Sequence, residues 1–303
     1  MKQTFYSNGK LLLTGEYLVL DGAVALALPT KFGQDLVIEE GADKIIRWKS
    51  FDSDGSIWFD DTLSFEEISN NGPFQDESIK SALISLLHQA FLLNPEFLEH
   101  SEGYNVETHL GFLKLWGLGS SSTLVNNIAQ WLQIDAFTLL KNSFGGSGYD
   151  IACAQRDTPI LYQLADGNTI IREVYFNPTF SAQLYFVYLN QKQNSPAAIA
   201  SYRNSQQNVA DKIAAIDIIT QNVLKSTDVE TFASELRKHE KIMAEILNAD
   251  PIQDKLFADF SGTVKSLGAW GGDFVIVVSK ENPTAYFQEK GFETILPFSE
   301  MIL

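Results

Sequence analysis

Two glycine-rich segments in the middle of the chain place hydroxyl and carboxylate side chains at turns. The first reads Gly117-Leu118-Gly119-Ser120-Ser121-Ser122 and leads into an apolar helical pattern. Glycines let the backbone approach a ligand, and a helix N-terminus adds partial positive charge, so this turn suits a phosphate. The serine hydroxyls could then reach the phosphate or Mg²⁺. A helix start capped by serine would explain the same residues.

The second segment delivers an acidic side chain at the mouth of a turn and reads Gly145-Gly146-Ser147-Gly148-Tyr149-Asp150. In a functional interpretation, Asp150 accepts a proton from, or orients, a substrate hydroxyl that attacks a γ-phosphoryl group. In the structural alternative, Asp150 caps a helix that begins at Ile151.

Two more segments lie near the ends of the chain. Lys10 stands at the edge of an apolar stretch and could supply a fixed positive charge beside a nucleophilic hydroxyl or its aspartate, although a solvated lysine is commoner. A glycine turn, Gly268-Ala269-Trp270-Gly271-Gly272-Asp273, enters a β-prone run and would equally suit a tight hairpin.

Other sequence motifs for nucleotide or metal binding do not match this chain. The phosphate loop of P-loop enzymes requires Gly-Lys followed by Ser or Thr, but Leu11 follows Gly9-Lys10. The dinucleotide fingerprint needs a small residue where Ser122 stands. The four histidines (His88, His100, His109 and His239) lack metal-site spacing, and the single cysteine has no partner.

Alternating strand and helix patterns surround these segments. We expect strands at residues 10–20, 104–110, 160–163, 169–174, 183–189, 274–278 and 294–296, and an antiparallel hairpin system at residues 36–38, 44–49 and 56–59. Helices are expected at residues 78–93, 123–132 and 284–291 and through most of 196–260.

Composition narrows the classes of partner. The chain has 303 residues, a formal net charge of −16 and a hydrophobic fraction of 45%, which indicates a folded, acidic protein. Its negative charge disfavours nucleic acid and anionic lipid. We expect no membrane span, no secretory signal and a cytoplasmic location.

The order of the four segments resembles that of the GHMP kinase family, which includes galactokinase, homoserine kinase, mevalonate kinase and phosphomevalonate kinase. The family's middle motif, Pro-x-x-x-Gly-Leu-Gly-Ser-Ser-Ala, is matched at Gly117 to Ser121, with Leu113 in the proline position and Ser122 in the alanine position. Its C-terminal Gly-Ala-Gly-Gly-Gly motif is matched at residues 268–272, where Trp270 replaces a glycine.

The resemblance implies a two-domain α+β fold. The expected N-terminal domain, residues 1–170, is an ATP-binding domain like ribosomal protein S5, and the expected C-terminal domain, residues 171–303, is ferredoxin-like. The implied activity is ATP-dependent phosphorylation of a small metabolite. The chain looks most similar to the mevalonate kinase and phosphomevalonate kinase branch, which suggests mevalonate or phosphomevalonate in isoprenoid precursor synthesis.

The resemblance also assigns roles to individual residues. Asp150 would be the catalytic carboxylate and Lys10 its cationic neighbour. The ATP phosphates would bind at Gly117, Leu118, Gly119, Ser120, Ser121 and Ser122, with Ser121 also binding Mg²⁺. Substrate would contact Glu16, Tyr17, Gly148, Gly271 and Gly272.

Several departures from the family pattern leave alternatives open. Leu139 stands where mevalonate kinase carries a second metal-binding glutamate. A catalytically silent relative that binds a metabolite or nucleotide is therefore the alternative function. A phosphorylated acceptor would need cations, for which Lys114, Lys192 and Arg203 are candidates, and a homodimer is left open.

Overall fold

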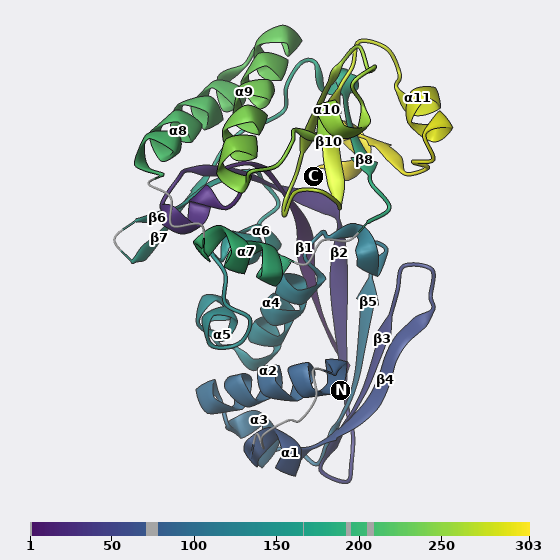
Figure 1. The fold of residues 1–303 in the computed structure, drawn as a ribbon. Coiled ribbons are helices and arrows are strands. Elements are labelled where there is room, and N and C mark those ends of the chain that lie inside the picture. Colours follow the sequence, from purple (N-terminus) through teal and green to yellow (C-terminus); the bar gives the residue numbers. More distant parts are fainter. Residues whose placement is uncertain (1, 71–77, 166, 192–194, 205–208) are drawn as a thin grey trace. The chain divides into compact units, whose positions relative to one another are not determined.

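The computed structural model describes residues 2–70, 78–165, 167–191, 195–204 and 209–303 (Figure 1). Lys192, one of the candidate substrate-binding cations, lies outside the described residues. The chain divides into two compact units. The first comprises Met1–Gly9, Phe32–Lys114 and Leu118–Gln155, and the second comprises Lys10–Lys31, Leu115–Gly117 and Arg156–Leu303. The domain boundary expected near residue 170 stays a prediction.

The strands of the first unit form a mixed sheet. Its members are β1 (Gln3–Thr14), β2 (Ala25–Glu40), β3 (Ile45–Phe51), β4 (Ile57–Ser64) and β5 (Tyr104–Leu110), and the first two continue into the second unit. The order is β4-β3-β5-β2, and β1 pairs with β2. Strand β5 runs antiparallel to β2, with Leu36 opposite Thr108, and parallel to β3, with Trp48 opposite Val106.

Two sequence expectations in this region were wrong in part. Only β3 and β4 form the expected hairpin, because β5 lies between β2 and β3. The strand expected over residues 10–20 ends at Thr14 and is followed by the 3₁₀ helix η1 (Leu18–Asp21). Gly15 explains the ending, since its φ is +88° and a Cβ there would lie 2.8 Å from the Ala25 Cα.

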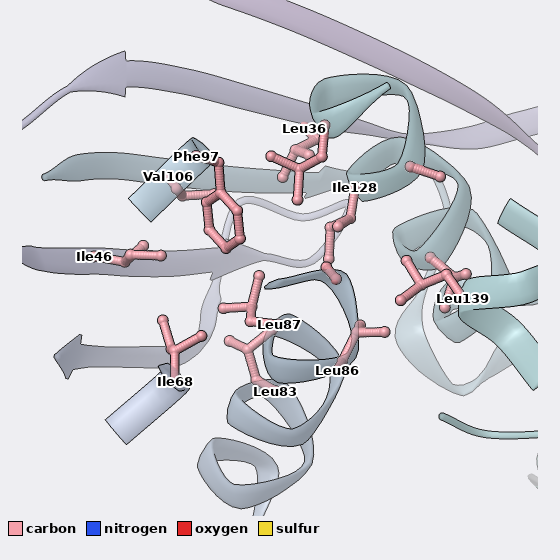
Figure 2. Packing of buried hydrophobic residues seen from close by; sticks show 14 of the residues in the cluster. Leu36, Ile46, Ile68, Leu83, Leu86, Leu87, Phe97, Val106, Ile128 and Leu139 are labelled. Carbon is pink, nitrogen blue, oxygen red and sulfur yellow. The ribbon is translucent and has the colours of Figure 1, made fainter. Parts of the chain in front are cut away.

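Helices cover one face of this sheet. They are α1 (Phe65–Asn70), α2 (Ile79–Leu93), α3 (Glu96–Glu99), α4 (Ser120–Leu132), α5 (Ala136–Asn142) and α6 (Tyr149–Ala154), with a 3₁₀ turn η2 at Lys114–Trp116. Figure 2 shows Leu83 and Leu87 of α2 turned toward Val106 of β5 and Ile128 of α4. The helix expected at residues 78–93 is confirmed, and Leu83, Leu86 and Leu87 lie on its buried face, whereas Ile79 is 47% exposed.

The second unit contains a four-stranded antiparallel sheet in the order β11-β8-β10-β9. Its strands are β8 (Leu184–Tyr188), β9 (Thr263–Ser266), β10 (Phe274–Val278) and β11 (Ile295–Pro297). A hairpin of β6 (Ile160–Ala165) and β7 (Asn168–Glu173) pairs with the start of β2, where Ala25 is opposite Tyr162.

Helices of the second unit follow the expected pattern. They are η3 (Ser181–Gln183), α7 (Ser195–Asn204), α8 (Ala210–Lys225), α9 (Val229–Leu247), α10 (Ile252–Leu256), α11 (Thr284–Glu289) and α12 (Phe298–Met301). Helices α8 and α9 pack side by side (Figure 1). Among the helices described, none has the length and apolar character needed to cross a bilayer.

Candidate functional site

The glycine-serine turn lies where the sequence places it, at the N-terminus of a helix. Helix α4 begins at Ser120, and its N-cap residue is Gly119, with a φ of +95° that suits glycine. The serine-cap alternative does not hold, because a glycine N-cap has no side chain to bond the first-turn amides. These amides and the helix dipole give the turn the chemistry of an anion-binding site.

A buried polar network fixes α4 against the strands of its own unit. Thr123 Oγ1 donates to Gln34 Oε1 (2.6 Å), and Asn127 Nδ2 donates to the Gln34 carbonyl (2.8 Å). Ser7 Oγ donates to Asn127 Oδ1 (2.7 Å). These residues were not predicted from the sequence, although adjacent asparagines inside an otherwise apolar helix were a signal for buried polar contacts.

Asp150 lies in the first turn of α6. The N-cap of this helix is Gly148, so Asp150 is not the cap that the structural alternative required. Asp150 Oδ2 accepts a hydrogen bond from Ser122 Oγ (3.2 Å). Asp150 Oδ1 is buried and finds no partner among the described residues. One carboxylate oxygen is therefore fixed, and the other is left for a ligand or water.

Lys10 and Gly117, the first residue of the glycine-serine turn, both belong to the second unit. Lys10 Nζ donates to the Gly117 carbonyl at 3.3 Å. Asp273 also lies at this residue, since a Cβ built on Gly117 would be 2.4 Å from the Asp273 carboxyl carbon. Asp273 has a φ of +52°, and its amide donates to the Gln191 carbonyl (2.6 Å). No role was predicted for Asp273 from the sequence.

Glu16 is completely buried between two basic side chains. Lys265 Nζ donates to Glu16 Oε1, and His239 Nε2 lies 3.0 Å from Glu16 Oε2. The same His239 nitrogen accepts from the Gly15 amide (2.9 Å), and burial lowers the pKa of His239, so the imidazole is neutral. Burial, the largest single effect, would raise the pKa of Glu16, but Lys265 and His239 together outweigh it and hold this pKa below its usual range. Because Glu16 directly precedes Tyr17, its contact with Lys265 fixes the turn in which Tyr17 lies.

Tyr17 connects this turn to the C-terminal glycine segment. Its hydroxyl donates to the Ala269 carbonyl at 2.6 Å, and its backbone has a φ of +57°. Burial is the main cause that raises the pKa of Tyr17 to about 12, and the negative charges of Glu16 and Asp273 contribute to the same rise. Tyr17, Trp270 and Gly271 line a groove of about 960 Å³ in this unit, whereas Gly272 is buried.

Metal binding by protein side chains has little support in the described residues. They hold no group of three or more His, Cys, Asp or Glu side chains arranged around a metal position. Leu139 is completely buried in the core shown in Figure 2. Ser121, in contrast, is exposed at the start of α4. Its hydroxyl is a donor that suits Mg²⁺, an ion that retains water and phosphate ligands.

The fold is that of the GHMP kinases, a class of α+β proteins, and this confirms the resemblance inferred from the motifs at the level of fold. The particular structures it resembles include *Methanococcus jannaschii* mevalonate kinase and *Streptococcus pneumoniae* phosphomevalonate kinase. The first is 16% identical with a TM-score of 0.70 and covers 98% of this chain and 97% of its own. The second, in complex with phosphomevalonate and AMPPNP, is 18% identical with a TM-score of 0.69. The match covers 99% of this chain and 98% of that structure's chain.

A sugar kinase gives a comparable match. *Lactococcus lactis* galactokinase complexed with galactose is 11% identical with a TM-score of 0.66, covering 95% of this chain and 88% of its own. No family model matches the sequence, and no curated protein matches it. Structures of enzymes with different acceptors thus share this fold, which leaves the acceptor to be decided by chemistry at the site.

Proposed function

We propose that this chain is an ATP-dependent kinase that transfers the γ-phosphoryl group to a hydroxyl or phosphate of a small metabolite. The first acceptors to test are mevalonate and phosphomevalonate, in isoprenoid precursor synthesis. The proposal includes a cytoplasmic location and leaves a homodimer open.

One observation carries the proposal. Both candidate catalytic side chains hydrogen-bond to the glycine-serine turn, Lys10 through the Gly117 carbonyl and Asp150 through the Ser122 hydroxyl. Each bond lies within one compact unit. A basic and an acidic group attached to the two ends of a phosphate-binding turn are the groups that phosphoryl transfer uses.

The proposed roles follow from charge and geometry. Amides at the start of α4 bind phosphate oxygens, and Lys10 stabilises the negative charge that develops during transfer. Asp150 aligns the acceptor oxygen for in-line attack and accepts its proton at Oδ1. The acceptor oxygen forms the new bond to the γ-phosphorus, while the bond to the β,γ-bridging oxygen breaks and ADP leaves.

Ser121 would hold Mg²⁺ together with the phosphate oxygens of ATP. When bound, this ion supplies neutralisation of the triphosphate charge. Leu118, Gly119 and Ser120 complete the phosphate contacts. Tyr17, Gly148, Gly271 and Gly272 are proposed to contact the acceptor, and Glu16 to act by holding Tyr17.

A product assay tests the proposal. Purified protein with ATP and Mg²⁺ is incubated with mevalonate, phosphomevalonate, homoserine or galactose, and phosphorylated product is detected by phosphorus NMR. We expect one acceptor to be phosphorylated. Asp150→Asn and Lys10→Met should each lower kcat about a hundredfold or more, equivalent to roughly 3 kcal/mol.

Asp54→Asn is the matched control, because Asp54 is an exposed turn residue in the same unit as Asp150. It should leave kcat unchanged. ATP binding without product from any acceptor would favour the catalytically silent relative, and near-native turnover of Asp150→Asn would remove Asp150 from the mechanism.

A further inference from the structure

Helices α4 and α6 are hydrogen-bonded to each other at both ends of α6. At the first end, Ser122 Oγ donates to Asp150 Oδ2 (3.2 Å). At the second end, Gln155 Nε2 donates to Asn126 Oδ1 (2.9 Å). Ser122 and Asn126 are about one turn apart on α4, so both bonds leave the same face of this helix. The position of α6 is thus defined relative to the glycine-serine turn.

Helix α4 is itself held in place, which makes it a fixed reference for Asp150. The residue after Ser122 is Thr123, whose hydroxyl bonds to Gln34 in β2. Asn126 Nδ2 donates to Ser7 Oγ in β1 (2.8 Å). These side chains are almost completely buried, and buried hydrogen bonds of this kind restrict the side chains that make them.

The two oxygens of Asp150 differ because of Ser122. Oδ2 has a donor, whereas Oδ1 is buried without a partner in the described part of the chain. An unsatisfied buried carboxylate oxygen is costly, and a hydroxyl donor arriving at Oδ1 would remove that cost. Rotation of the carboxylate would break the Ser122 bond, so this bond favours one orientation.

We propose that Ser122 is a positioning residue that fixes the Asp150 carboxylate and leaves Oδ1 to receive the acceptor hydroxyl. This inference rests on the proposed kinase function. The GHMP motif that this segment resembles has alanine at this position, so the serine hydroxyl is a feature of this chain. Ser122 is buried, in contrast to the exposed Ser121, which separates its role from that of a phosphate or metal ligand.

The test compares Ser122→Ala with a matched serine replacement. Ser122→Ala should lower kcat about tenfold, because a misaligned carboxylate affects the transfer step, while KM for ATP changes less than about twofold. Ser143→Ala is the control. Ser143 lies in the same unit, and its hydroxyl donates to the Leu139 carbonyl (2.7 Å) and more weakly to the Leu140 carbonyl (3.4 Å), so the variant loses hydrogen bonding away from Asp150. It should lower the melting temperature and leave kcat unchanged.

A double-mutant cycle distinguishes positioning from a general effect on stability. Adding Ser122→Ala to Asp150→Asn should cause no further fall in kcat, because the group that Ser122 positions is already absent. Losses that multiply, or a Ser122→Ala enzyme with native kcat, would overturn the role of Ser122. A wild-type protein that phosphorylates no acceptor would instead contradict the proposed function.

Discussion

Lys265 Nζ lies 2.5 Å from Glu16 Oε1, and neither side chain has any exposed surface. Lys265 also donates to the Ser266 carbonyl at 2.7 Å. Removing two charges from water is costly, and their mutual attraction offsets that cost only while both are present. Because Glu16 precedes Tyr17 and Lys265 lies in β9, this pair connects the Tyr17 turn to the sheet beside the C-terminal glycine segment.

Replacing one member of this pair should strongly destabilise the protein. Lys265→Met leaves the Glu16 carboxylate buried without its cation, and we expect the free energy of unfolding to fall by about 3 to 5 kcal/mol. Urea denaturation measures this change. Lys280→Met is the control, because its partner Glu230 and Lys280 itself are both exposed, and the variant should unfold like the wild type. Similar losses in the two variants would contradict the importance of the buried pair.

Glu240 should make stability depend on pH. Burial raises the pKa of this carboxyl from 4.5 to about 7, although Lys265 and three donors from Ile252 and Ser266 oppose the shift. Between these values the folded state binds more protons than the unfolded state, so stability falls as pH rises from 4.5 to 7. Relative to Glu240→Gln, wild-type stability should decline by about 1.4 kcal/mol per pH unit in this window.

Urea denaturation of wild type and Glu240→Gln at pH 4.5, 6 and 7.5 measures this difference. The window extends from pH 4.5 to about 7 because these are the pKa values of Glu240 in the unfolded and folded states. Glu230→Gln removes an exposed carboxylate from the same helix and controls for the change in net charge. A constant difference between wild type and Glu240→Gln across the window would show that Glu240 is ionised in the fold.

The fold was predictable from sequence where local patterns decide it. The leucine spacing of α2 and the β-prone run of β10 gave elements that the structure confirms, with β10 at the expected residues 274–278. Motif order gave the fold class. The pairing of β3 with β5 was not predictable in this way, because the described part of the intervening chain contains three helices and the pairing depends on packing over the whole sheet.

The candidate site was predictable as residue types but not as contacts. Sequence patterns indicated Lys10, Asp150 and the glycine-serine turn. They did not indicate that Ser122 would bond to Asp150, or that Asp273 would lie against Gly117, because both contacts join distant parts of the chain. The family resemblance suggested a substrate contact for Glu16, and only its burial beside Lys265 indicates a structural role.

Tyr17→Phe should separate acceptor binding from ATP binding. Its high pKa keeps the Tyr17 hydroxyl protonated at neutral pH, so it remains a donor to the Ala269 carbonyl. Loss of this bond should cost about 1 kcal/mol of stability and raise KM for the acceptor several-fold, with KM for ATP unchanged. Tyr175→Phe, at a side chain 83% exposed, is the control for both measurements. Equal changes in the two KM values would contradict a role confined to the acceptor side.

Gly117→Ala and Gly145→Ala distinguish a close contact from a requirement for backbone angle alone. Their φ values are nearly equal, +71° and +68°, but a Cβ at Gly117 would meet the Asp273 carboxylate, whereas one at Gly145 has nothing within 4 Å. Gly145→Ala should therefore lose only about 1 kcal/mol from backbone strain. Gly117→Ala must also displace Asp273 or the carbonyl that Lys10 contacts. We expect Gly117→Ala to lose more stability than Gly145→Ala in urea denaturation and to weaken ATP binding about tenfold in calorimetry. Equal effects of the two substitutions would show that the Asp273 contact does not constrain the turn.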